Sequence, residues 1–294
     1  MTIVAGFPGN GFVVLAADSE EGGGIAKSSV HKIALVDKGN CKCLIGGAGH
    51  GDFIDLAVQH AEEQIPVTGD VKTIRQRLEA IVTDIYANRI ANYHEHQQDD
   101  LSFELLCAVW SKKDGQPRLV RVRRSAALLK KTPEAIGSGT YLARYLFDTL
   151  GGSTDLNLFQ AMRLLTHVIA QAKKYVSYCG GATQAVSIAT DGRVIEVPEN
   201  LINQYRLMDS AIVEDIARVV FYATDPIATE MNGEKIKLAL EVGLAQWNAR
   251  LLPKLFAAMG LPAALIAQQQ QAAAAAKSPD VQPSSSTSSS TDHT

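Results

Sequence analysis

Thr2 occupies a position that could support chemistry on its own, because it directly follows the initiator Met1. Removing a methionine from before a small second residue leaves that residue with a free α-amine. A threonine hydroxyl is too weakly acidic to attack an amide unaided, whereas a terminal amine with a pKa of about 7.7 to 8.0 can accept its proton near neutral pH. Thr2 is therefore a candidate nucleophile that carries its own base. The alternative is an ordinary second residue.

Asp18 and Lys32 are the charged residues best placed to assist such a nucleophile. Asp18 ends the apolar run VVLAAD, and Lys32 lies at the start of HKIALV, so each stands at an end of an expected strand. A lysine ammonium near the terminal amine would disfavour protonation of that amine, and the carboxylate would orient the lysine. The alternative is a solvated surface ion pair, which contributes little to stability.

Two glycine-containing turns could supply the remaining groups of a hydrolytic site. Gly46 and Gly47 precede an expected helix in LIGGAGHGD, where backbone N–H groups could stabilise an oxyanion. The run lacks the Lys-Ser/Thr pair of a phosphate loop, which leaves a plain strand-to-helix turn as the alternative. Ser138, in Gly-Ser-Gly, could bring a hydroxyl to the same cleft or cap a helix.

Two kinds of periodicity divide the chain up to residue 197. Alternating apolar residues between turn signals predict strands, and apolar spacings of three to four residues predict helices. The predicted strands lie at 2–7, 12–18, 31–36 and 41–47, in hairpins within 101–131, and within 180–197. The predicted helices lie at 52–60, 74–90, 141–150 and 156–175. Strand groups on both sides of a helix pair predict an α+β fold, a four-layer αββα sandwich of two sheets covered by helices.

Three regions follow from this pattern: a 2–198 domain that holds every candidate site residue, a 199–267 helical extension and a 268–294 tail. The extension carries apolar stripes, such as Ile216 with Val219 and Leu240 with Leu244, that would pack on an outer layer or between subunits. The tail is rich in Ser, Thr and Pro and is expected to be disordered.

Deleting residues 268–294 is therefore expected to change the free energy of unfolding by less than about 0.5 kcal/mol and to leave hydrolysis intact. The tail offers little apolar surface to bury and contains none of the candidate catalytic groups. Chemical unfolding and activity assays of the shortened chain test this. A shortened chain that did not fold, or that lost activity while its assembly stayed intact, would contradict the expectation.

Composition excludes several other classes of function. The 294 residues carry a formal net charge of -3, so no broad basic surface is available for nucleic acid or an anionic membrane. The 4 cysteines have neither the spacing of a disulfide framework nor that of a zinc site, and no cofactor is expected. With neither a signal peptide nor a transmembrane segment recognisable, cytoplasmic residence is expected.

The dispersed motifs together resemble the catalytic β-subunits of proteasomes and HslV, over roughly residues 2–197. The resemblance is carried by the order and spacing of five motifs: Thr2-Ile3-Val4, Gly11 to Ser19, Val30-His31-Lys32-Ile33, Gly46-Gly47-Ala48-Gly49 and Ile136-Gly137-Ser138-Gly139. It implies an N-terminal nucleophile (Ntn) hydrolase fold and a threonine-type endopeptidase. It also implies polypeptide substrates and a homo-oligomeric ring that encloses the active sites, with an ATPase or α-type ring as a possible partner.

By this resemblance Thr2 would be the nucleophile, Lys32 and Asp18 its charge pair, the Gly46 N–H the oxyanion donor and Ser138 part of the supporting network. The expected first strand begins almost at Thr2, which favours the β type over α-type subunits with their N-terminal helix. Two other functions remain as alternatives. One is a small-molecule amidase of the same fold, and the other is a catalytically silent ring or scaffold subunit.

Two departures from the family pattern bear on the site. The segment Tyr175–Gly181 reads YVSYCGG, without the Asp that proteasome β-subunits commonly carry before a Ser-Gly-Gly, so no role is assigned to Ser177 or Cys179. The loop after Asp18 carries Glu20 and Glu21, which are either solvated carboxylates or groups that favour basic side chains of the substrate.

Overall fold

The computed structural model describes residues 2–23, 26–150 and 155–205, all within the first of the chain's two compact units, Met1–Arg218. Most of the predicted helical extension, including Ile216 and Leu240, and the whole predicted tail lie outside these residues. The described start of the extension, 199–205, is helical and buries Leu201, Ile202 and Tyr205. No helix among the described residues is long and apolar enough to cross a membrane.

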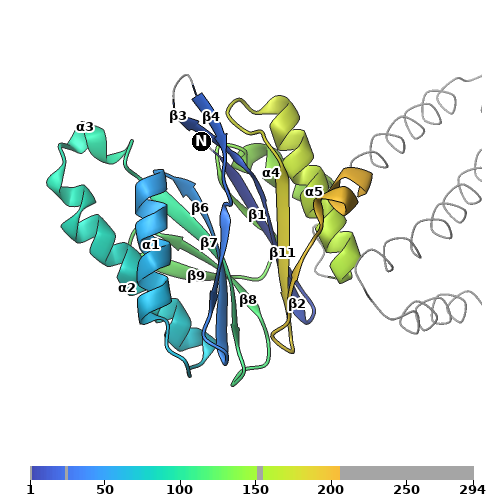
Figure 1. Cartoon of the computed structure of the whole chain (residues 1–294), viewed down its shortest axis with the longest axis horizontal. Helices are drawn as coiled ribbons and strands as arrows, with labels where there is room; N and C mark the ends of the chain where they lie inside the picture. The colour runs from blue at the N-terminus through green and yellow to red at the C-terminus, as the bar shows by residue number, and fades with distance from the viewer. Residues whose placement is uncertain (1, 24–25, 151–154, 206–294) are drawn as a thin grey trace, which may run out of the picture. The chain divides into compact units, whose positions relative to one another are not determined.

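Two antiparallel five-stranded sheets form the centre of the fold (Figure 1). The first sheet has the strand order β10-β1-β2-β11-β12. Its strands are β1 (Ile3–Gly9), β2 (Phe12–Asp18), β10 (Glu134–Gly137), β11 (Thr183–Ala189) and β12 (Val194–Glu196). The second sheet runs in the order β5-β6-β7-β8-β9. Its strands are β5 (Ile33–Asp37), β6 (Cys41–Gly49), β7 (Phe103–Ser111), β8 (Arg118–Arg123) and β9 (Ala126–Lys130).

Helices cover the outer face of each sheet. The pair α1 (Gly51–Gln64) and α2 (Val71–Asn88) packs on the second sheet, and α4 (Thr140–Leu150) and α5 (Leu158–Tyr175) lie on the side of the first (Figure 1). A 3-10 turn (Ile90–Asn92) and the short α3 (Glu95–Gln98) connect α2 to β7. The predicted four-layer αββα sandwich is thereby confirmed.

The core extends beyond the space between the sheets, because each sheet buries both of its faces. Between the sheets, Val4 and Leu15 of the first pack against Leu44 and Leu106 of the second. Beneath the helices, Ile74 and its neighbours on α2 pack on the outer face of the second sheet. Strands buried on both faces read as continuous apolar runs, which explains why FVVLAAD and FELLCAVWS show so little alternation.

A small hairpin after β2 was not predicted from the sequence. The strands β3 (Glu20–Gly23) and β4 (Ala26–Ser29) pair with each other in a separate two-stranded sheet. Their residues are mostly Glu, Gly and Ser, which lack the apolar alternation that marks a strand. The hairpin matters because it joins Asp18 to the segment that carries Lys32.

Replacing Glu134 by Gln is expected to cost about 3 kcal/mol of unfolding free energy at neutral pH. The carboxylate is buried at the start of β10, 2.5 Å from the Lys130 ammonium and 3.4 and 3.5 Å from the guanidinium groups of Arg121 and Arg144. Burial would raise the pKa of Glu134, but Lys130 and Arg121 outweigh burial and lower it. The Gln variant would remove this anion from Lys130 and Arg144, whereas Arg121 would keep its 2.6 Å ion pair with Glu104.

The pH dependence of this loss has a definite sign. Since the folded-state pKa is lowered, the stabilisation by Glu134 is complete above the unfolded-state pKa of about 4.3 and disappears as pH falls through the folded value. Urea unfolding of both proteins from pH 7 down to acid should show the difference shrinking. Glu62→Gln, on the exposed face of α1, is the matched control and should change stability by less than about 0.5 kcal/mol. A Glu134 variant as stable as that control would disprove the assignment.

Candidate active site

The strand registers bring the predicted site residues to one end of the sandwich. In the first sheet Ile3 pairs with Gly137, and Thr183 pairs with Asp18. The same end of the sheet therefore holds the starts of β1 and β11 and the ends of β2 and β10. In the second sheet Ile33 pairs with Gly46, which sets the start of β5 beside the end of β6. Lys32 directly precedes β5 and lies near the start of β1.

Thr2, Asp18 and Lys32 form one buried hydrogen-bonded group. The Thr2 hydroxyl donates to Asp18 Oδ1 at 2.5 Å, and the Lys32 ammonium donates both to Thr2 Oγ1 and, at 2.9 Å, to Asp18 Oδ1. The Asp18 side chain is 0% exposed and that of Lys32 is 9% exposed. The predicted meeting of these three residues is thus present, and the alternative of a solvated surface pair is wrong for Asp18 and Lys32.

Two backbone N–H groups also donate hydrogen bonds to the Asp18 carboxylate. The N–H of Ile3 donates to Oδ1 at 3.0 Å, and the N–H of Gly180 donates to Oδ2 at 3.0 Å. A buried carboxylate is costly unless it is paired and hydrogen-bonded, and here both oxygens are satisfied. Asp18 is therefore held in one orientation whether or not the Thr2 hydroxyl is present.

Lys32 is held from both ends. Its ammonium also donates to the carbonyl oxygen of Glu20 in the β3–β4 hairpin, while its backbone N–H donates to the Gln184 side chain at 2.9 Å. The amide of Gln184 in turn donates to the Val30 carbonyl at 2.9 Å. Gln184 is a supporting residue that no sequence pattern indicates, since its two partners lie 152 and 154 residues away along the chain.

Ser138 contacts the backbone of Thr2. Its N–H donates to the Thr2 carbonyl at 2.9 Å, and its hydroxyl donates to the same oxygen at 3.2 Å. The preceding Gly137 has a φ of +92°, and a Cβ there would collide with the Thr2 carbonyl, so glycine is required. Among the described residues, no hydrogen bond of the Ser138 side chain supports its alternative role as a cap of the following helix.

The 175–181 segment supports the site without the family's Asp. Besides the Gly180 N–H bond to Asp18, the Gly180 carbonyl accepts the N–H groups of Ser19 and Glu20 at 3.2 and 3.1 Å. The Cys179 thiol lies 3.7 Å from the Ser138 hydroxyl, and burial raises the pKa of this thiol. The Cys179 thiol is therefore neutral near pH 7. Ser177 makes no such contact with any residue that the structure describes.

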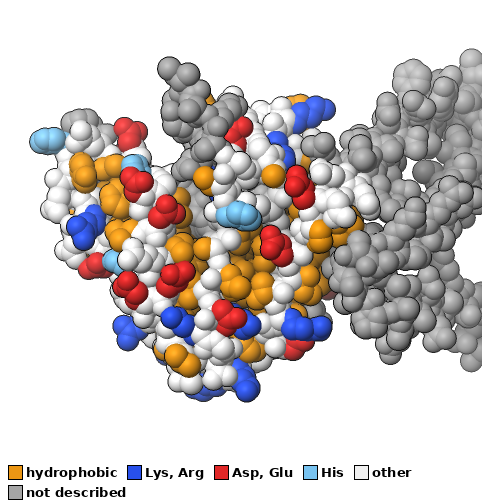
Figure 2. All heavy atoms as spheres, viewed as in Figure 1, with side chains coloured by type: hydrophobic (Ala, Val, Ile, Leu, Met, Phe, Trp, Pro, Cys, Tyr) orange, Lys and Arg blue, Asp and Glu red, His pale blue; other side chains and the backbone are white. Residues whose placement is uncertain are grey.

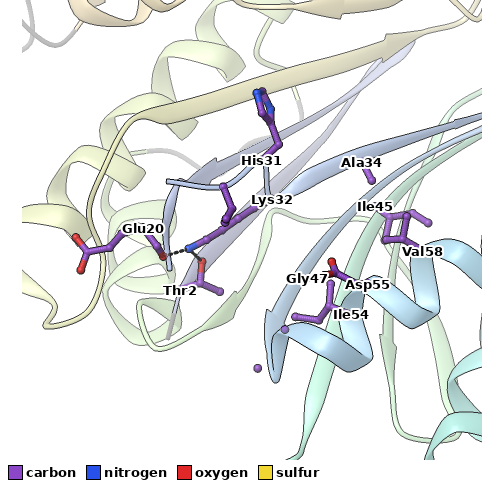
Figure 3. A pocket seen from close by; sticks show the side chains of 13 residues that line it. Thr2, Glu20, His31, Lys32, Ala34, Ile45, Gly47, Ile54, Asp55 and Val58 are labelled. Atoms are coloured by element: carbon purple, nitrogen blue, oxygen red, sulfur yellow. Dashed lines mark hydrogen bonds between the residues drawn. The ribbon is translucent and has the colours of Figure 1, made fainter. Parts of the chain in front are cut away.

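A pocket opens directly beside Thr2 (Figure 3). It is lined by Thr2, Glu20, Val30, His31, Lys32, Ala34, Ile45, Gly47, Gly49, Gly51, Ile54, Asp55 and Val58. Gly47 is among these residues and Gly46 is not, because the side of Gly46 that would carry a Cβ faces Val4 in the core. N–H groups lie in the plane of the sheet and alternate in direction along a strand. The Asn40 carbonyl accepts the Lys112 N–H on the β7 side, so the Gly46 N–H points to its β7 partner Leu106 and is not free to bind an oxyanion. The Gly47 N–H points to the other side, where the pairing with β5 has ended at Gly46, and is the candidate oxyanion donor in place of Gly46.

Comparison with known proteins places this arrangement in a family. Residues 2–188 match the family described as "Proteasome subunit". The chain belongs to the proteasome subunit family. No curated protein matches significantly.

Solved structures agree on the proteasome-subunit fold. Anbu from Hyphomicrobium sp. strain MC1, as the Gly-1 mutant, superimposes with a TM-score of 0.61 at 14% identity, covering 74% of this chain and 97% of that one. Anbu, described as an ancestral beta-subunit, from Yersinia bercovieri gives 0.61 at 16% identity, covering 77% and 98%. At such identities the likeness establishes the fold alone. Among the described residues, no group of three or more His, Cys, Asp or Glu side chains could hold a metal ion.

Proposed function

We propose that this proteasome-family subunit is a threonine-type endopeptidase that uses Thr2, freed of Met1, as its nucleophile. The observation that carries the proposal is the buried contact of the Lys32 ammonium and the Asp18 carboxylate with the Thr2 hydroxyl at the mouth of a pocket. A hydroxyl that only stabilised the fold would not need a buried cation beside it, because burying charge is costly.

The chemistry follows from the positions of these groups. The Thr2 α-amine takes the hydroxyl proton, directly or through water, as Oγ1 attacks the peptide carbonyl carbon. The proton passes to the departing amine as the carbon–nitrogen bond breaks, which leaves an ester on Thr2. Water, deprotonated by the same amine, then cleaves the ester and restores the hydroxyl. Lys32 disfavours protonation of the amine, and Asp18 holds Lys32 in place.

Negative charge that develops on the substrate oxygen needs a hydrogen-bond donor in the pocket beside Thr2. We assign this role to the N–H of Gly47, near the end of β6, on the side where the pairing with β5 has stopped at Gly46. Ser138 positions Thr2 through its carbonyl oxygen. No metal or organic cofactor takes part in this proposal.

Proteasome-family subunits form oligomeric rings. For this chain we propose a homo-oligomeric ring in the cytoplasm that encloses the sites and admits unfolded polypeptide, with an ATPase or α-type ring as a possible partner. Native mass spectrometry, together with turnover of an unfolded protein and of short amides, separates this proposal from a small-molecule amidase. An amidase would be monomeric or dimeric and would act on the short amides only.

Intact mass after exposure to a peptide epoxyketone tests the nucleophile and the base together, because that group reacts with an adjacent hydroxyl and amine. We expect one adduct per chain, located on Thr2. Assembly into a ring without any adduct would support the silent scaffold subunit and would refute the proposed peptidase.

Lys32→Ala is expected to lower kcat/KM for peptide hydrolysis by about 10² to 10⁴-fold, because the ammonium no longer disfavours protonation of the terminal amine. Removing this cation also leaves the buried Asp18 carboxylate unpaired, which costs about 3 to 5 kcal/mol of unfolding free energy. Activity is therefore compared on protein shown to be folded and assembled, and the rate of epoxyketone labelling is measured beside it.

Two further variants show whether the loss of activity comes from the missing charge at Lys32 or from a general loss of stability. Lys42 pairs with Asp37 at 2.9 Å on a more exposed part of the second sheet, so Lys42→Ala should have little effect on either measurement. Lys32→Arg keeps the charge, although its planar head fits the site poorly, and should retain more activity than Lys32→Ala. If folded Lys32→Ala hydrolysed peptides as fast as wild type, Lys32 would have no role in the mechanism.

A further inference from the structure

The pocket beside Thr2 has the size and lining to hold one substrate side chain. Its volume is about 160 Å³, similar to an engineered cavity of about 150 Å³ that holds benzene. Ala34 on β5, Ile45 on β6, and Ile54 with Val58 on α1 provide aliphatic walls. Such walls favour a side chain with an apolar stem.

One carboxylate interrupts these walls. Gly51, Ile54, Asp55 and Val58 recur at helical spacing, so one face of α1 points to the pocket and Asp55 belongs to that face. Figure 3 shows Asp55 on the side of α1 that faces Thr2. Within the described part of the chain Asp55 makes no hydrogen bond or ion pair, in contrast to Asp18.

The other charged groups around the pocket do not neutralise Asp55. The Lys32 ammonium is already bound to Asp18, to Thr2 and to the Glu20 carbonyl. The imidazole of His31 points away from both Thr2 and Asp55 (Figure 3). The Glu20 carboxylate also points away from Thr2, and it packs so closely on Gly180 that a Cβ there would collide with it. The pocket therefore presents aliphatic walls and one unpaired negative charge.

We propose that this pocket selects peptides with lysine or arginine as the acyl residue, the one whose carbonyl Thr2 attacks. This inference rests on the proposed function. The methylene stem would lie along Ala34, Ile45 and Val58, and the cation would reach Asp55. The acyl residue is favoured over the leaving residue because it stays bonded to Thr2 Oγ1 in the ester, next to the mouth of this pocket. Asp55, not Glu20, is thus the carboxylate that would set the preference.

The test uses peptide aminocoumarins that differ only in the acyl residue: arginine, lysine, norleucine and glutamate. Norleucine has a similar apolar stem without the charge. We expect the wild-type assembly to cleave the arginine and lysine peptides with a kcat/KM at least 10-fold above norleucine, and glutamate most slowly. In Asp55→Asn the ratio of arginine to norleucine should fall by about 10 to 100-fold. Asp55→Lys should invert the order of arginine and glutamate.

Asp52→Asn is the matched control, since Asp52 and Asp55 are both exposed carboxylates on α1 and only Asp55 lines the pocket. It should leave the ratio unchanged. A wild-type preference for norleucine, or a ratio that Asp55→Asn does not alter, would overturn the inference while hydrolysis itself upheld the proposed function. If no peptide is cleaved, labelling of Thr2 by epoxyketones with arginine or norleucine at the same position gives the same comparison. Absence of any labelling would reject the proposed function and this inference with it.

Discussion

Thr2→Ala is expected to lower peptide hydrolysis by about 10⁴-fold or more and to abolish epoxyketone labelling, while the protein still folds. The substitution removes the atom that would bond to the acyl carbon. It leaves Asp18 with the Lys32 ammonium and the N–H groups of Ile3 and Gly180 as hydrogen-bond donors, so no unpaired buried charge results. Intact mass and peptide turnover on assembled protein measure the two effects.

Two further variants test whether the effect of Thr2→Ala comes from loss of the nucleophile. Thr2→Ser keeps a hydroxyl and an amine on the same residue and should retain part of the activity. Thr149→Ala makes the same change at an exposed position on α4, where the hydroxyl donates to the carbonyls of Tyr145 and Leu146 in its own helix, and should leave the activity unchanged. If assembled Thr2→Ala hydrolysed peptides at the wild-type rate, Thr2 would not be the nucleophile.

The fold was predictable because most of its elements carry a strong local signal. The helix predicted near 74–90 is α2, Val71–Asn88, with Ile74, Leu78 and Ile81 buried on one face. The exception is the β3–β4 hairpin, which has no apolar periodicity to reveal it. It is held by pairing of its own backbone and by contacts such as the Val30 N–H to the Ser19 carbonyl at 2.9 Å.

The site was predictable only in part. Asp18 and Lys32 could be proposed because each lies at a strand end, but their meeting depends on the sheet registers and on how the two sheets pack, which no local pattern encodes. Gln184 and Gly180 support Lys32 and Asp18 across large separations in sequence. A glutamine in a strand or a glycine in a turn carries no sign of such a partner.

The carboxylates near the pocket illustrate the same limit. Glu20 was a candidate for substrate selection because it follows Asp18 closely in sequence, yet its side chain turns toward Gly180. Asp55 carries no functional signal in the sequence, since an acidic residue in an amphipathic helix is ordinarily solvated, and Asp55 is indeed exposed although it lines the pocket. Only the packing of α1 against the site distinguishes its pocket-facing positions from its solvent-facing ones.

Retention of Met1 is expected to inactivate a folded protein by about 10³-fold or more, because the Thr2 nitrogen would then be an amide and could not serve as the general base. The clearest experiment extends the chain by a segment that a specific protease removes directly before Thr2. The same preparation is then assayed before and after trimming. N-terminal mass spectrometry reports the fraction of free Thr2, and hydrolysis should rise in proportion to that fraction.

This experiment separates the amine from the hydroxyl, which Thr2→Ala cannot do. Extended protein keeps Oγ1, Lys32 and Asp18, so a loss of activity that trimming reverses points to the amine. An extension could also block the pocket, and for that reason the trimmed protein is compared with a form whose free Thr2 amine is acetylated, a group much smaller than a residue. If the acetylated or fully extended protein hydrolysed peptides at the rate of the trimmed one, the α-amine would not be the base and the proposed mechanism would fail.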